Sequence, residues 1–315
     1  MKQSHDDALQ EALSALKSVE DQGGVCDCKF DKDKISSIFV STSSMISNLK
    51  AHRPDLVLLD TTFGTNVDKY KLAMFVYPCR RTNRTRVAAF AFLSDERDAN
   101  VGFMLQQFHS LYQPTYFFVD KDFHQLRMLK RIFLESTVFL CIFHVLKYMR
   151  SVIATLNAPV DDLPAFKQEL FATLKRLIHS RDAEAFAQNK AAWLEMVKGT
   201  VKVGGKLKSL EEYFQSNWLD ENDDGGHYLW ATYHRRGKPL LFTNTSNRIE
   251  SYFAALKKDM LGRKMTKARL AGFIPYLLSF ITRREFSLDV KVKRFRPNDN
   301  RFHNELSEAS LKLTE

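Results

Sequence analysis

The sequence predicts an α/β fold with three layers and a mixed sheet, interrupted by an α-helical insertion in its second half. Three observations lead to this fold class. Segments typical of antiparallel strands come first, strands then alternate with helices, and beyond residue 158 helical spacing replaces the strand pattern. A meander that continues into strand–helix units places helices on both faces of one sheet.

The chain has the length and the apolar content that such a core requires. It has 315 residues, of which 44% are hydrophobic, and 25 of them are Phe, which excludes a disordered tail or a small disulfide-stapled scaffold. No signal-peptide apolar region and no membrane-length apolar run is present, so we expect a soluble intracellular protein. The four cysteines fit a reducing compartment, and Cys26 and Cys28 are interpreted as ordinary thiols.

The first half of the chain supplies the strands. Residues 1–24 predict a polar helical stretch that ends at a Gly-Gly pair, within a polar segment that reaches residue 34. A polar, arginine-rich connection between two later apolar runs indicates an antiparallel hairpin. The expected elements are a strand at 35–40, a helix at 43–52, a buried strand at 56–60, and hairpin strands at 71–77 and 86–93.

Strand–helix alternation follows the hairpin. Ser94 and Asp95 are good helix caps, and the apolar residues after them recur at helical spacing. The expected elements are a helix at 96–112, a buried strand at 116–120, a helix at 123–133, a strand at 138–141 and a helix at 143–156.

The remaining chain predicts helices. Three helical stretches fill residues 158–240, which we interpret as an insertion, and two more follow at 246–260 and 267–284. The predicted division is therefore a polar segment at 1–34, a first part of the core at 35–157, the insertion at 158–240, helices that complete the core at 241–289, and a basic polar tail at 290–315.

Two aspartates close predicted buried strands. Asp60 and Asp120 each follow a short apolar run, and the carboxyl ends of strands are where an α/β sheet displays reactive groups. Neighbouring carboxylates of this kind are natural ligands of a divalent metal ion. The alternative is that each aspartate caps the turn after its strand, and the pattern alone leaves both interpretations open.

Four motifs connect these aspartates with a known family. Asp60 lies in LLDTTFGTNVDKYKL and Asp120 in FFVDKDF, while Cys141 and His144 lie in CIFHVLK and Glu250 in TNTSNRIESYF. In this order the motifs resemble the catalytic domain of Mutator-like (MULE) transposases, including their relatives among the SWIM-zinc-finger proteins. The resemblance covers roughly residues 56–258.

The resemblance implies a ribonuclease H-like fold with a D-D-E triad of Asp60, Asp120 and Glu250, separated by 60 and 130 residues. Such a triad holds two Mg²⁺ (or Mn²⁺) ions for in-line attack on a phosphodiester. The implied function is a nuclear DDE-type DNA transposase or integrase-like core that cleaves DNA and transfers strands. The alternatives are a domesticated, catalytically silent nuclear module of the same fold that binds DNA or protein, and a structure-specific nuclease.

Four further residues are expected to support the triad. Cys141 and His144 form half of a zinc motif without a second half nearby, so we expect them to pack beside the active site, with His144 touching a phosphate or orienting Asp120. A buried Cys with a capping His is the other interpretation. Asn247 and Arg248 would position Glu250 or contact a phosphate, or else only cap their helix.

The basic residues favour a polyanionic partner, which we expect to be DNA. The formal net charge is +10, and residues 251–315 contribute fourteen Lys or Arg against seven Asp or Glu, or +7. A solvated turn is the alternative for the first four arginines. The predicted nucleic-acid contacts are Arg80, Arg81, Arg84, Arg86, Lys257, Lys258, Arg263, Lys264, Lys267 and Arg269.

Two features of the family are not recognised here. Relatives carry an N-terminal zinc-dependent DNA-binding module and often a C-terminal SWIM finger of the type C-x-C…C-x-H, whereas the C-x-C of Cys26 and Cys28 comes before the catalytic motifs. We therefore expect a catalytic core alone. The sequence leaves open whether the chain forms a homo-oligomer.

Overall fold

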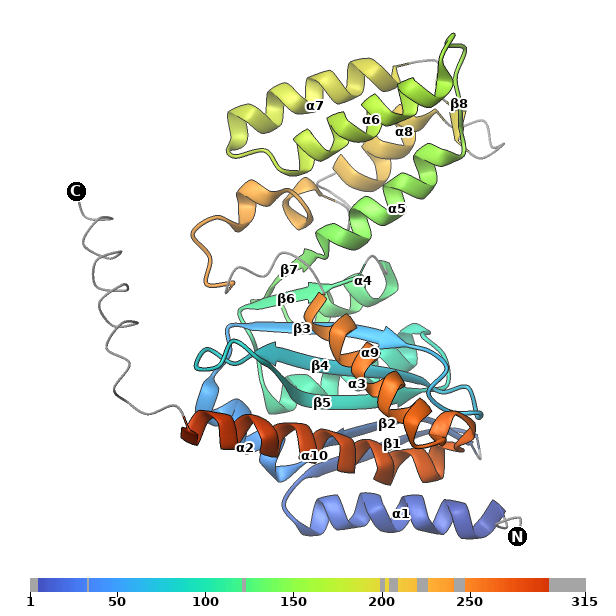
Figure 1. Cartoon of the computed structure of the whole chain (residues 1–315), viewed down its shortest axis with the longest axis vertical. Helices are drawn as coiled ribbons and strands as arrows, with labels where there is room; N and C mark the ends of the chain where they lie inside the picture. Colours follow the sequence, from blue (N-terminus) through green and yellow to red (C-terminus); the bar gives the residue numbers. More distant parts are fainter. Residues whose placement is uncertain are drawn as a thin grey trace, which may run out of the picture.

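A computed structural model of the chain describes residues 5–32, 34–120, 123–198, 202–203, 209–219, 226–240 and 247–294. Its centre is a seven-stranded sheet in the order β1-β2-β5-β4-β3-β6-β7 (Figure 1). The strands are β1 (Val25–Asp31), β2 (Lys34–Ser41), β3 (Leu56–Thr62), β4 (Lys71–Pro78), β5 (Thr85–Leu93), β6 (Tyr116–Val119) and β7 (Thr137–Leu140).

The sheet is mixed, as predicted. The five strands β1, β2, β5, β4 and β3 lie side by side in this order, and each pair of neighbours is antiparallel. Strand β3 pairs with β6 in parallel, and β6 pairs with β7 in parallel. A parallel pair needs a crossover connection, and helices between β5, β6 and β7 provide it. The antiparallel half of the sheet is therefore local in sequence, and the parallel half is where strand ends gather at one edge.

Helices cover both faces of this sheet. Alternate residues of β3 point to opposite sides, so Val57 and Leu59 belong to one core and Leu56 and Leu58 to the other. The first core is covered by α3 (Asp98–Leu111), α4 (Phe123–Ile132) and α5 (Ile142–Ala154). The second is covered by α1 (His5–Asp21), α9 (Asn247–Gly262) and α10 (Leu270–Arg294). The short α2 (Ser43–His52) contributes to both. These layers confirm the predicted fold class.

Two strands differ from the expected elements. The structure adds β1 at the sheet edge, where no strand was expected before residue 35. This edge strand carries Asp27 between Cys26 and Cys28, and Lys29 follows, so it shows no continuous apolar run. Cys26 and Cys28 pack against the second core. Strand β3 also continues past Asp60, because Thr61 and Thr62 still pair with β4.

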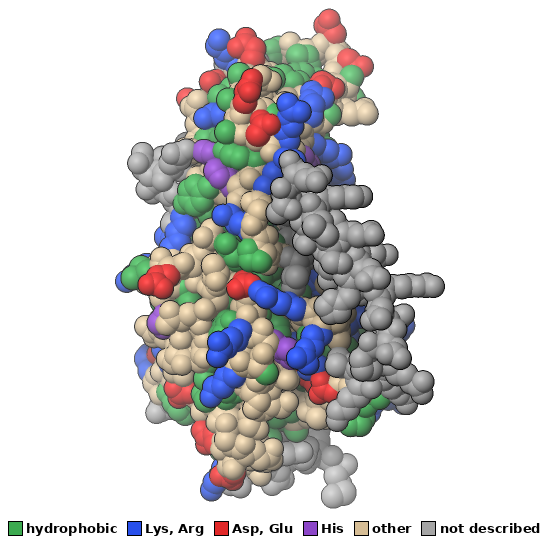
Figure 2. All heavy atoms as spheres, turned by 90° about the vertical axis from the view of Figure 1, so that its left-hand side faces the viewer, with side chains coloured by type: hydrophobic (Ala, Val, Ile, Leu, Met, Phe, Trp, Pro, Cys, Tyr) green, Lys and Arg blue, Asp and Glu red, His purple; other side chains and the backbone are tan. Residues whose placement is uncertain are grey.

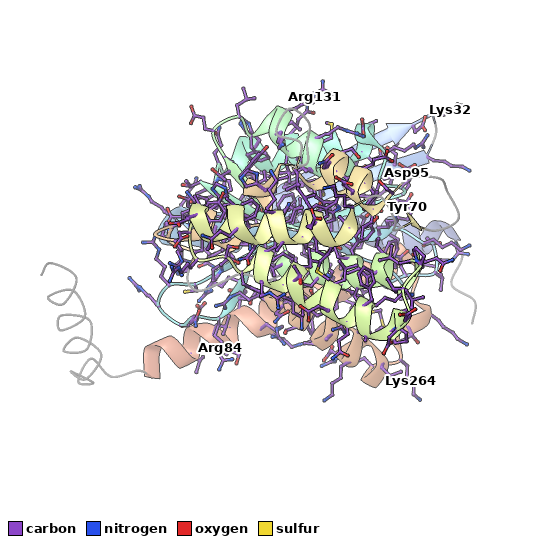
Figure 3. All side chains as sticks on the ribbon, turned by 90° about the horizontal axis from the view of Figure 1, so that it is seen from above. Lys32, Tyr70, Arg84, Asp95, Arg131 and Lys264 are labelled. Carbon is purple, nitrogen blue, oxygen red and sulfur yellow. The ribbon has the colours of Figure 1, made fainter. Side chains whose placement is uncertain are left out.

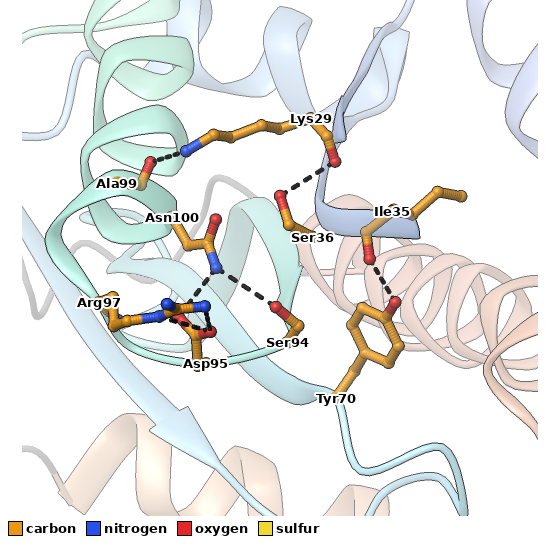
Figure 4. A network of polar contacts seen from close by, with 9 residues as sticks. All are labelled: Lys29, Ile35, Ser36, Tyr70, Ser94, Asp95, Arg97, Ala99 and Asn100. Atoms are coloured by element: carbon orange, nitrogen blue, oxygen red, sulfur yellow. Dashed lines mark hydrogen bonds and ion pairs between the residues drawn. The ribbon is translucent and has the colours of Figure 1, made fainter. Parts of the chain in front are cut away.

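The N-cap residue of α3 is Arg97, and the expected cap residues Ser94 and Asp95 instead bond to the segment that leads into the helix. The helix begins at Asp98, two residues later than predicted, and Asp95 accepts the backbone N–H of Arg97 at 3.1 Å. Figure 4 shows Asn100 reaching back to Ser94 and Asp95, at 3.3 and 2.9 Å. These bonds fix the chain between β5 and α3.

A helical unit lies beyond β7, in the upper part of Figure 1. It holds α6 (Leu163–Ile178), α7 (Ala183–Val197), α8 (Leu210–Phe214), a π turn (Gln215–Leu219), two 3₁₀ turns (His227–Leu229 and Thr232–Arg235) and the strand pair β8 (Leu156–Asn157) and β9 (Lys202–Val203). Its core is built on Trp193, Trp218 and Trp230, each buried, and it is continuous with the first core of the sheet.

Arg235 fastens this unit to the sheet. Its guanidinium donates to the carbonyl of Leu140 at 2.6 Å, at the end of β7, and lies over the rings of Phe118 and Phe139. Burial lowers the pKa of Arg235 to about 9.

The α10 helix extends to Arg294, past the expected start of the basic tail, and residues 295–315 lie outside the described residues. In the described part of the chain, no helix is both long and apolar enough to cross a bilayer.

Candidate active site

Asp60 and Asp120 come to the same level of the sheet. Strands β3 and β6 are parallel, with Leu59 opposite Val119, so the next residue of each chain segment is an aspartate. Strand β7 continues the same edge, since Leu140 lies opposite Val119 and the backbone N–H of Cys141 donates to the Val119 carbonyl at 2.8 Å. Three consecutive strands thus deliver Asp60, Asp120 and Cys141 to neighbouring positions.

His144 joins this edge to α9. It lies in the first turn of α5, and Glu250 lies in the first turn of α9. Nδ1 of His144 is 3.4 Å from an Asp120 carboxylate oxygen, and Nε2 is 3.5 Å from one of Glu250. One imidazole ring therefore contacts both carboxylates, although 106 residues separate His144 from Glu250 in the sequence.

The groups perturb one another electrostatically. The pKa of Asp60 is raised to about 7, mainly by burial and further by the charges of Asp120 and Glu250. The backbone N–H of Thr61, which donates to Asp60 at 2.7 Å, and the charge of His144 act in the opposite direction. Burial alone would lower the pKa of His144. A hydrogen bond with Cys141 and the carboxylates of Asp120 and Glu250 outweigh it and raise that pKa to about 9. The ring is thus cationic at neutral pH.

Two sets of donors include Glu250, and among the described residues only the set with Cys141 and His144 has all its ligand atoms close enough to share one ion. The oxygen donors of Asp60, Asp120 and Glu250 have the chemistry that Mg²⁺ prefers. In addition, Cys141 Sγ, a ring nitrogen of His144 and a carboxylate oxygen of Glu250 all lie within 4.8 Å of one another. A thiolate and an imidazole suit a softer ion such as Zn²⁺. The sequence motif showed Cys141 and His144 without a partner because the third group comes from a helix far along the chain.

Arg248 lies on the other side of α9 from Glu250. Its guanidinium donates to the backbone carbonyl of Asn83 at 2.8 Å and to the side-chain oxygen of Asn83 at 2.6 Å, in the β4–β5 turn. It thereby ties the first turn of α9 to that turn. Asn247 is the first residue of α9 and is exposed.

Of the four arginines around the β4–β5 turn, Arg86 requires a correction. It is 2% exposed and pairs with Glu285 and Asp289 of α10, so its guanidinium is occupied inside the fold and cannot contact a nucleic acid. The alternation of β5 explains this, because Arg86 is the first inward-facing residue after the turn. Arg80 pairs with Asp55, and Arg81 and Arg84 are exposed.

The basic residues of α9 and the segment after it are exposed, namely Lys257, Lys258, Arg263, Lys264, Lys267 and Arg269. Arg263 contacts Asp259 at 3.1 Å. Figure 3 shows Arg84 and Lys264 at opposite ends of α10. The predicted basic residues therefore form two separate groups, and only the group at the β4–β5 turn lies beside the first turn of α9.

Comparison with known proteins supports the fold. Residues 15–139 match the family model described as the RNaseH-like domain of zinc finger SWIM domain-containing protein 1/3. This stretch includes Asp60 and Asp120 and ends before Cys141 and Glu250, and it confirms the predicted resemblance to the ribonuclease H-like domain of SWIM-zinc-finger relatives. Among solved structures, the catalytic core domain of BIV integrase is similar, with 14% identity over 51% of this chain and 95% of that one, at a TM-score of 0.21. No curated protein matches the chain.

Proposed function

From a ribonuclease H-like domain with clustered carboxylates, we propose that the chain is a metal-dependent, DDE-type core that cleaves DNA phosphodiesters and transfers strands. The observation that carries the proposal is that Asp120 and Glu250 both contact His144, while the charges of all three residues shift the pKa of Asp60 on the neighbouring strand. Charged groups gathered in this way cost folding free energy, and such clusters are typical of functional sites.

The donor chemistry fits two Mg²⁺ or Mn²⁺ ions. Asp60 on β3, Asp120 after β6 and Glu250 on α9 would hold the ions. Bound ions of this kind make the attacking oxygen nucleophilic and stabilise the leaving oxygen. The raised pKa of Asp60 supports this assignment, because a buried carboxylate among like charges is stabilised by a cation.

His144 is the positioning residue of this site. Its cationic ring holds Asp120 on one nitrogen and Glu250 on the other, at 3.4 and 3.5 Å, and so keeps carboxylates from two segments at a fixed separation. The hydrogen bond with Cys141 also orients the ring. The exposed lysines of α9 and the +10 net charge favour DNA as the substrate, and a chain that acts on DNA would work in the nucleus.

The test is cleavage and strand transfer on a labelled DNA duplex during titration with Mg²⁺ or Mn²⁺. We expect metal-dependent cleavage that Asp60→Asn lowers by at least about 10²–10³-fold, the loss typical of removing one electrostatic stabiliser of the transition state. Asp55→Asn is the matched control, since Asp55 precedes the same strand at its opposite end and pairs with Arg80. It should cleave like the wild type.

The opposite outcome has a defined meaning. Salt-sensitive DNA binding without any metal response, equal in the wild type and Asp60→Asn, would overturn the catalytic proposal. The chain would then act as a silent binding module of the same fold. Thermal melting of both variants shows whether either result comes from unfolding.

A further inference from the structure

A basic cavity of about 340 Å³ opens on the side of α9 that faces away from Glu250. It lies between the first turn of α9, the C-terminal half of α10 and the end of the β4–β5 turn. Figure 2 faces the side of the molecule with this turn, and Lys and Arg side chains gather over its lower half. The lining residues are Arg84, Thr85, Arg248, Ser251, Tyr252, Arg284, Ser287 and Leu288.

Helix periodicity explains why these residues face one another. On α9 the lining positions are 248, 251 and 252, and on α10 they are 284, 287 and 288. Both sets follow the i, i+3, i+4 spacing of one helix face. Glu250 is two residues after Arg248, which is about 200° around the helix, so it points away from the cavity and toward His144.

The cavity is cationic. Among the described residues, three arginines and no carboxylate line it. The two acidic residues of the same part of α10, Glu285 and Asp289, are turned to Arg86. Within the described ranges, neither Arg84 nor Arg284 forms an ion pair. The Arg284 guanidinium is held over the rings of Tyr252 and Phe280, at 4.9 and 5.5 Å, so its position is fixed before any ligand arrives.

The hydroxyl of Tyr252 is the second, independent observation. Tyr252 is 2% exposed and lines the cavity, yet its hydroxyl has no hydrogen-bond partner among the described residues. A buried hydroxyl without a partner is destabilising, so a ligand oxygen that accepts a hydrogen bond from it would remove this penalty. Ser251, Ser287 and Thr85 add hydroxyl donors around the same space.

Guanidinium groups and hydroxyls around a small cavity are the donors that a tetrahedral oxyanion requires. We propose that this cavity binds one phosphodiester group of a nucleic-acid backbone, on the side of α9 away from Glu250. The volume lies at the lower end of the range for ligand pockets and suits one phosphate with its flanking sugar. The choice of nucleic acid as the source of the phosphate rests on the proposed function, whereas the oxyanion site does not.

The test measures DNA affinity with EDTA present, so that catalysis plays no part. Fluorescence anisotropy with a labelled duplex, at 50 to 200 mM salt, compares the wild type with Arg284→Gln. We expect several-fold weaker binding at the lowest salt and a salt slope smaller by about 1, the value for one lost phosphate contact. Tyr252→Phe, which keeps the ring, should weaken binding in the same direction and by less.

Arg283→Gln is the matched control. Arg283 is the neighbouring residue of α10, lies outside the cavity lining and contacts Asp259 at 3.3 Å. It should leave the salt slope unchanged. Equal effects of the two substitutions, or none from Arg284→Gln in a protein with wild-type melting, would overturn the proposal.

A second arm separates the two sources of phosphate. Inorganic phosphate at millimolar concentration is added to the wild type and Arg284→Gln during thermal melting. A rise in Tm of the wild type alone, together with an unchanged DNA salt slope in Arg284→Gln, would assign the cavity to a free phosphate and overturn the nucleic-acid assignment. Failure of metal-dependent cleavage would leave the anisotropy result standing, so the two proposals fail separately.

Discussion

The two sides of the first turn of α9 carry opposite charge. Glu250 faces Asp60, Asp120 and His144, whereas Arg248 faces the cavity with Arg84 and Arg284. Only one residue separates Arg248 from Glu250 in the sequence. Helix geometry places residues i and i+2 about 200° apart, so one short motif contributes to an acidic site and to a basic site on opposite sides of the helix. The two side chains therefore do not neutralise each other.

The two sides also recruit different parts of the fold. The acidic side draws on the ends of parallel strands, where β3, β6 and β7 display consecutive side chains at one edge. The basic side draws on an antiparallel turn and on α10, which comes last among the described elements. Sheet pairing therefore positions the acidic groups, and helix packing positions the basic groups.

The largest effect is expected from releasing α10. Arg86→Leu leaves Glu285 buried without its partner, which costs about 3–5 kcal/mol when a buried pair is broken. Urea or thermal unfolding should show this loss, and DNA binding should fall because one wall of the basic cavity moves. Arg80→Leu, which removes an exposed pair with Asp55, should cost no more than about 1 kcal/mol. Equal losses for the two variants would show that the Arg86 pairs do not hold α10.

A middle effect concerns the stability of the acidic side. The pKa of Asp60 is raised to about 7 in the folded protein, above the unfolded value of about 3.9, so the folded state binds this proton more tightly. Protonated Asp60 therefore stabilises the folded state fully below pH 4, and this contribution is lost as the pH rises to about 7 and the carboxyl group ionises. In Asp60→Asn the side chain stays neutral at every pH, so this stability is not lost, and its amide oxygen still accepts the backbone N–H of Thr61.

Melting in EDTA between pH 5 and 8 measures this effect. The Tm of Asp60→Asn should exceed that of the wild type by several °C at pH 8, and the difference should shrink toward pH 5. A difference that stays constant over this range would show that the Asp60 carboxylate is not the source.

The smallest effect is expected from the lysines that precede α10, at the end of this helix opposite to the basic cavity. Lys264→Gln and Lys267→Gln remove exposed charges that water already solvates, so each should weaken DNA binding less than Arg284→Gln does in the same anisotropy assay. A larger effect from either lysine would move the principal DNA contact away from the first turn of α9.

The site was predictable in unequal parts. Apolar runs that end in aspartate, together with the family motifs, were enough to select Asp60, Asp120 and Glu250, because a strand pattern and a motif are local properties. The contact of His144 with Asp120 was among the expectations, whereas its contact with Glu250 was not predictable, since it depends on where α9 crosses the sheet. The role of Arg86 was predicted wrongly for the same reason, because its partners are about 200 residues away on α10.

By itself, the sequence determined the mixed sheet, the order of strands and helices and the candidate carboxylates, because apolar periodicity and short motifs act over a few residues. The tertiary structure alone decided that β1 adds an edge strand, that Arg86 is interior, and that Arg84, Arg248, Arg284 and the Tyr252 hydroxyl share a cavity. These outcomes depend on packing between segments far apart in the chain. This long-range packing decides which side chains are buried and which charges pair, and local sequence patterns do not predict it.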